Sequence, residues 1–167
     1  AAGLKFRIMP SDVLAAQFEA LKANPLKKPF SEVFILLQTK AIDGQENTYS
    51  NTYSQKFFEL QPYLTETNHG LLDYMVVVTA EFWQSIPEDT RTQLKALLDE
   101  ALVYGNNLAN EKDLEDKQKI IDANRTKIIL LTPEERTQWV EAMKPVWKEF
   151  EGEIGKDLID AAYKSNK

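Results

Sequence analysis

The chain has 167 residues, of which 43% are hydrophobic, so it can bury one sizeable core or two small ones. Its net charge of −6 disfavours a nucleic-acid surface, because binding to phosphates requires clustered lysine and arginine. No cysteine is present, which excludes disulfides and thiolate metal sites. The longest apolar run, Tyr74–Val78, is too short to span a bilayer.

The first forty residues alternate between strand and helix signals. Apolar and charged residues alternate from Leu4 to Met9, which predicts a half-buried strand that begins almost at the first residue. We therefore expect the chain to start inside a larger protein. Ser11 is a suitable N-cap for a helix that ends before Asn24 and Pro25. The next expected elements are an extended segment at 26–29, a helix from Ser31 to Lys40, and a strand end with a turn at 42–44.

The middle of the chain contains its most strand-like run. Residues 44–54 are polar and predict a loop, whereas 57–63 and 71–79 look extended, the second because of Met75–Val78. A short helix is predicted at 80–86. Pro87 then suits the start of a long helix that runs to Glu115 or beyond.

The last forty residues predict one strand and two helices. Thr132, Pro133 and Glu135 form a helix start with a capping box, after a strand at 126–130. We expect this helix to reach Lys144 and another to span 146–163. Strands that alternate with helices predict an α/β fold with crossover connections.

Motifs for catalysis and for cofactors are scarce. His69 is the only histidine, so an acid–base enzyme would have to use it, together with Glu46 or Asp43. A histidine beside a glycine is more often a hydrogen-bonded loop residue. No ligand spacing for a metal and no glycine-rich phosphate loop occurs, and we expect no cofactor.

Arg7 is the residue that best suits the binding of an anion. It lies near the end of a predicted strand, where open α/β folds place groups that face a ligand. A guanidinium offers a fixed fork of donors that matches a carboxylate. Composition alone favours the alternative, a solvated strand arginine. The amides of Gln45 and Asn47 could fix a second carboxylate oxygen or could satisfy turn backbone.

A set of motifs in fixed order resembles the substrate-binding receptors of TRAP transporters. The resemblance continues loosely to the C-terminal helices, so it covers nearly the whole chain. The motifs are Leu4–Val13, Ala20–Pro25, Pro29–Phe34, Leu37–Thr39 with Asp43–Asn47, Tyr53–Phe57, Thr67–His69 and Phe82–Trp83.

The resemblance implies an α/β fold like that of periplasmic binding proteins, with two lobes that close over an organic acid. Arg7 matches the arginine that forms a salt bridge with the ligand carboxylate. Asn47 matches the amide that assists it, Phe30 the aromatic ring of the cleft, and His69 a histidine near the hinge. The expected role is capture of a small organic acid in the periplasm and its delivery to TRAP membrane permease subunits. The alternatives are a sensor module of the same fold that signals to a membrane kinase, or the binding of another organic acid.

Two further expectations come from the resemblance. Residues 9–13, 44–51 and 68–70 are most similar to receptors for succinate, malate or fumarate, and Met9 with Pro10 departs from the sialic-acid pattern. Such receptors are close to twice this length. One lobe would then be nearly complete, from 1–70 and 113–167 with the long C-terminal helices. Residues 71–112 would belong to a partial second lobe, whose apolar strand Met75–Val78 a missing N-terminal portion or another chain would cover.

Overall fold

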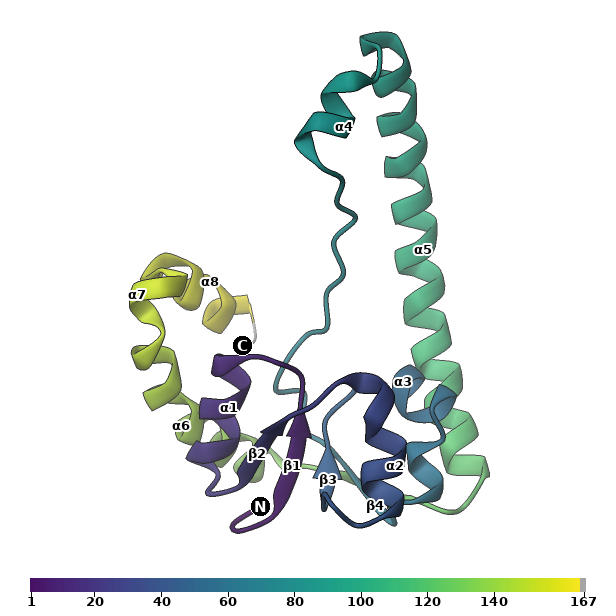
Figure 1. Cartoon of the computed structure of the whole chain (residues 1–167). Helices are drawn as coiled ribbons and strands as arrows, with labels where there is room; N and C mark the ends of the chain where they lie inside the picture. The colour runs from purple at the N-terminus through teal and green to yellow at the C-terminus, as the bar shows by residue number, and fades with distance from the viewer. Residues whose placement is uncertain (166–167) are drawn as a thin grey trace.

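The computed structural model describes residues 1–165 and shows an α/β unit from which one long helix projects (Figure 1). Its first sheet is parallel and has the strand order β2-β1-β3. Arg7 on the central strand pairs with Leu26 on one neighbour and with Gln45 on the other. The strands are β1 (Lys5–Ile8), β2 (Asn24–Lys27) and β3 (Gly44–Gln45).

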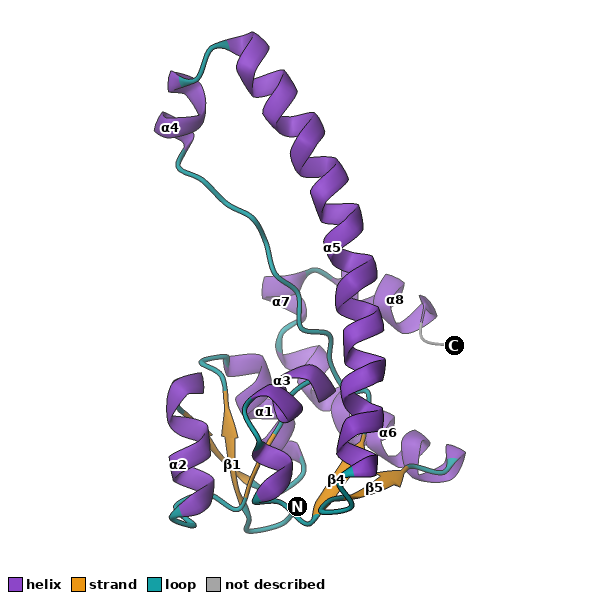
Figure 2. Cartoon of the chain, turned by 90° about the vertical axis from the view of Figure 1, so that its right-hand side faces the viewer, coloured by secondary structure: helices purple, strands orange, loops and turns teal. Residues whose placement is uncertain are grey.

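The helices of this unit cover opposite faces of the sheet, as Figure 2 shows for α1 and α2. Helix α1 (Asp12–Ala20) follows β1, and its N-cap Ser11 accepts a hydrogen bond from the Leu14 amide, as predicted. Helix α2 (Val33–Gln38) follows a 3₁₀ turn, η1 (Phe30–Glu32), so the predicted Ser31 cap was wrong. Two core clusters result, with Ile8, Phe18 and Ala23 under α1, and Val33, Leu37, Ile42 and Phe57 under α2.

A second, smaller sheet pairs β4 (Tyr63–Glu66) in parallel with β5 (Lys127–Leu130). These strands are far apart in the chain and are joined through the long helix. Thr126 holds the entry to β5, because its buried hydroxyl donates to the carbonyls of Phe58 and Gln61. The extended segment predicted at 57–63 was wrong in its first part, which is the 3₁₀ turn η2 (Phe57–Glu59).

The polar segment predicted as a loop at 44–54 contains a helix, α3 (Tyr49–Ser54). Thr48 caps it, and the Ser50 amide donates to Asp113 on the long helix over 2.8 Å. Tyr49 and Lys117 both donate to the Glu66 carboxylate over 2.6 Å. These contacts tie α3 to the base of the long helix and to β4. They were invisible in the sequence because their partners lie more than fifteen residues away.

Residues 71–112 contain no buried residue, and most of this segment extends away from the sheets (Figure 1). The strand predicted at Met75–Val78 was wrong: no residue from 71 to 79 is in a strand, and all four of these side chains are more than half exposed. A strand requires a hydrogen-bonded neighbour, and no described strand lies beside this segment. The predicted helices are present, as α4 (Ala80–Ser85) and α5 (Glu88–Asp122).

The C-terminal helices begin with the predicted capping box, in which Thr132 and Glu135 exchange hydrogen bonds. Helix α6 (Pro133–Glu149) continues through Pro145, past the predicted end at Lys144. The single helix predicted at 146–163 was wrong. The chain instead breaks at Gly155, whose φ of 95° few other residues adopt, and forms α7 (Glu151–Ile154) and α8 (Lys156–Ser165).

Candidate anion-binding site

Arg7 lies at the carboxyl end of the central strand, in the position that the sequence indicated. The side chains of a strand alternate between faces, so Phe6 and Ile8 do not share its side, and Ile8 packs under α1. Arg7 therefore faces the α2 side, where it is only 4% exposed. Chain order reverses between β1 and β3 in this sheet, and crevices for ligands form at the carboxyl ends of strands at such points.

The guanidinium of Arg7 is fixed by one hydrogen bond and one ring. Its Nε donates to the Lys28 carbonyl over 2.8 Å, and its Cζ lies 5.8 Å from the centroid of the Phe30 ring. Phe30 in turn meets Phe57 of the core edge-on at 5.9 Å. Among the hydrogen bonds of residues 1–165, Arg7 uses only Nε, which leaves both terminal nitrogens for a ligand.

Burial lowers the pKa of the Arg7 guanidinium, and the charge of Glu46 opposes this shift. Arginine nevertheless stays protonated in proteins, so the site keeps a positive charge at every relevant pH. Nearly all of its hydration has been lost, and a carboxylate in the same place would regain donors that water otherwise supplies.

Two amides extend the site along the end of β3. Asn47 donates to Gln45 Oε1 over 2.6 Å and accepts a hydrogen bond from Asn51 over 2.9 Å. Gln45 sits beside Arg7 in the strand register. The structure thus places Asn47 one amide away from Arg7, inside an ordered polar row rather than in direct contact with the guanidinium.

His69 lies on the other side of this edge, between two aromatic side chains. Its Nδ1 is 2.6 Å from Thr67 Oγ1, and its ring meets Phe18 at 6.1 Å and Trp139 at 6.2 Å. Its Nε2 is 3.9 Å from a carboxylate oxygen of Glu46. Burial lowers the pKa of His69, whereas burial raises the pKa of Glu46 against the attraction of Arg7. His69 is therefore neutral near neutral pH.

The catalytic alternative that used Asp43 does not fit this arrangement. Asp43 accepts a hydrogen bond from the Lys5 amide at the amino end of β1, which is the opposite end of the strand from Arg7. The contact of His69 with Trp139 was missed, because seventy residues separate the two and neither belongs to a short motif.

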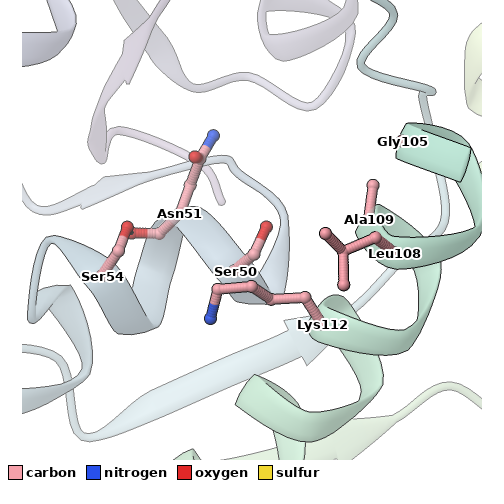
Figure 3. A pocket seen from close by; sticks show the side chains of 7 residues that line it. All are labelled: Ser50, Asn51, Ser54, Gly105, Leu108, Ala109 and Lys112. Carbon is pink, nitrogen blue, oxygen red and sulfur yellow. The ribbon is translucent and has the colours of Figure 1, made fainter. Parts of the chain in front are cut away.

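Two cavities lie near the site, and Arg7 lines neither of them. The larger, of about 520 Å³, lies between α1, α6 and the C-terminal helices, and His69 and Arg136 are among its walls. The smaller, of about 400 Å³, separates α3 from α5, and Figure 3 shows Ser50 directed toward Leu108 and Ala109.

Neither a metal centre nor a membrane span is found in the part of the chain that the structure describes. No three acidic or histidine side chains gather there in a way that could hold an ion. None of the helices in residues 1–165 combines the length and the apolar character that crossing a bilayer requires.

Comparison of structures defines the class of protein. A TRAP periplasmic solute-binding protein of Shewanella oneidensis, solved with bound succinate, superposes with a TM-score of 0.96 at 62% identity. The match covers all of this chain and 55% of that protein. A TRAP protein of Pseudomonas aeruginosa PAO1 with bound L-malate gives a TM-score of 0.86 at 40% identity, over 89% of this chain and 52% of the other. The fold is an α/β unit of the periplasmic solute-binding class.

Residues 1–153 match the bacterial extracellular solute-binding proteins of family 7, and the chain belongs to this family. It is 64% identical to the C4-dicarboxylate-binding periplasmic protein DctP of Shewanella loihica, over 99% of this chain and 49% of that protein. The chain therefore spans about half the length of the curated relatives it matches.

Proposed function

We propose that this chain is part of a receptor that captures succinate, malate or fumarate outside the cytoplasm for a TRAP-type secondary transporter. The observation that carries this proposal is Arg7, which is buried, donates through Nε to the Lys28 carbonyl and lies at the carboxyl edge of the sheet. Phe30 covers the guanidinium, and Gln45 and Asn47 supply amides beside it. His69 lies 3.9 Å from the carboxylate of Glu46, the residue between these two amides.

The choice of a four-carbon dicarboxylate rests on the relatives. The Shewanella oneidensis structure holds succinate, the Pseudomonas structure holds L-malate, and the Shewanella loihica relative is named for C4-dicarboxylates. A single arginine balances only one of the two carboxylates of such a ligand. A second lobe would then provide donors for the other carboxylate.

A receptor of two lobes that close over the ligand fits the way this chain divides into a packed part and a projecting part. Residues 1–70 and 113–167 would form one lobe, and 71–112 would belong to the other, which fits the lack of any buried residue in 71–112. Such hinged closure removes water from the bound anion and makes its pairing with Arg7 strong. The remainder of the receptor would also cover the exposed side chains of Met75–Val78.

The proposed location is the periplasm, and the proposed partners are the membrane subunits of the transporter. We propose no enzymatic role, because the relatives that the chain matches are solute-binding proteins. A sensor that reports to a membrane kinase is the second candidate. Dicarboxylate uptake by cells that carry the full-length receptor and its permease separates the two, since a sensor does not restore uptake.

The test of ligand class is a thermal-shift panel of organic acids on the full-length receptor. A four-carbon dicarboxylate at about a hundred times its dissociation constant adds roughly 2.7 kcal/mol to the free energy of unfolding. Arg7→Lys should lose most of this shift. A panel in which sugar acids raise the melting temperature and dicarboxylates do not would refute the proposal.

A further inference from the structure

Near Arg7 lie two further titratable groups, Glu46 and His69, which the binding of an anion does not by itself require. Glu46 directly follows β3 and His69 follows β4, and their closest atoms, Oε2 and Nε2, are 3.9 Å apart. Each side chain is 19% exposed. Glu46 lies between Gln45 and Asn47, whose amides hydrogen-bond to each other, and its own carboxylate meets the imidazole of His69.

Aromatic rings pack against the imidazole of this pair, and the charge of Arg7 acts on its carboxylate. Aromatic rings hold the imidazole on both sides, and a hydroxyl occupies its other nitrogen. Only one of the two nitrogens is therefore free to meet the carboxylate. The groups that face the pair are Arg7 on β1, Phe18 on α1, Thr67 after β4 and Trp139 on α6. Arg136 on α6 lines the same cavity as His69.

The environments of Glu46 and His69 shift the pKa values of the two side chains toward each other. Burial raises the pKa of Glu46, which the nearby Arg7 opposes, and burial lowers the pKa of His69. A carboxylate and an imidazole whose values approach each other compete for the same proton. Among the ion pairs of residues 1–165, none joins Glu46 directly to Arg7, so the positive charge acts on this carboxylate from beyond 4 Å.

We propose that Glu46 and His69 form a proton-accepting pair that takes up a proton from solvent when a dicarboxylate binds to Arg7. The inference rests on the proposed function. A carboxylate on Arg7 neutralises the positive charge that stabilises ionised Glu46, and it adds negative charge near the Glu46 carboxylate. Both effects favour protonation. The ligand arrives fully ionised, and the proton stays on the protein until the ligand leaves.

Isothermal titration of the full-length receptor with succinate measures this proton directly. The titration is repeated at about pH 7.5 in phosphate and in Tris, whose heats of ionisation differ, and the difference in binding heat gives the number of protons exchanged. Both succinate carboxylates are ionised at this pH, so the ligand itself takes up none. We expect uptake of a measurable fraction of a proton, and an affinity that rises as the pH falls toward 6.5.

Variants separate this role from a purely structural one. Glu46→Gln should abolish proton uptake, whereas Glu59→Gln, the same change on an exposed turn residue, should leave it unchanged. His69→Gln should reduce uptake while keeping a hydrogen-bonding side chain, and it serves if Glu46→Gln does not fold. A structural role alone would alter the affinity without altering the exchanged proton.

Two results would overturn the inference. One is equal binding heat in the two buffers for the wild-type receptor, and the other is full proton uptake in both Glu46→Gln and His69→Gln. If succinate binds without proton exchange, the proposed dicarboxylate function stands and only the proposed proton uptake is refuted. If succinate, malate and fumarate all fail to bind, the proposed function fails as well.

Discussion

Replacing Arg7 by methionine tests the site most directly. Methionine keeps an unbranched side chain of similar length and removes only the charge and the donors. Arg125→Met is the matched control, because Arg125 is exposed and outside the site. The measurement is isothermal titration of the full-length receptor with succinate, alongside its melting temperature without ligand.

The expected loss follows from the burial of Arg7, which is 4% exposed and leaves two terminal nitrogens for the ligand. Without the guanidinium, a desolvated carboxylate has no opposite charge, which costs on the order of 3–5 kcal/mol of binding free energy. Affinity therefore falls by about two to three and a half decades. Arg7→Lys should rescue little, since an ammonium cannot match the two oxygens with a fixed fork.

The same substitution should not weaken the unliganded fold. The guanidinium has given up its hydration for one hydrogen bond to the Lys28 carbonyl, so removing it relieves a desolvation penalty, which offsets the lost hydrogen bond and the lost attraction to Glu46. We expect an unchanged or higher melting temperature for Arg7→Met. An affinity within tenfold of the wild type would refute the reasoning, because the buried charge would then contribute almost nothing to binding.

Three further predictions concern stability, each measured by denaturant unfolding of the full-length receptor. Gly44→Ala should destabilise by about 1–3 kcal/mol, because the added Cβ would lie 2.6 Å from the Phe6 ring; no change would mean that the ring moves freely. Thr126→Val should cost about 1–3 kcal/mol, since two buried carbonyls lose their donor, whereas exposed Thr137→Val should cost less. His69 binds a proton more readily unfolded than folded, so its contribution falls as pH drops below about 6.5, and His69→Gln should flatten this decline. An unflattened pH profile would contradict the burial of the ring.

Short-range signals were sufficient for much of the fold. Ser11 and Thr132 cap helices at the predicted positions, because an N-cap hydrogen bond joins residues three apart. The segment Met75–Val78 has strong strand propensity and yet forms no strand, because β-structure needs a partner that no strand within residues 1–165 offers. Helix α3 was not predicted, because its stability comes from tertiary contacts and not from a local signal. Its sequence is polar, and its packing against α5 stabilises it.

The sequence by itself determined which chemical groups are available: a strand arginine, neighbouring amides, one histidine and a family pattern that covers nearly the whole chain. Tertiary structure decided which of them meet. The parallel register sets Gln45 beside Arg7, and the segment after β4 brings His69 to within 3.9 Å of Glu46. Such contacts depend on how distant strands pair and how helices cover them. No local pattern encodes these distances, because they arise from the burial of one set of apolar faces against another.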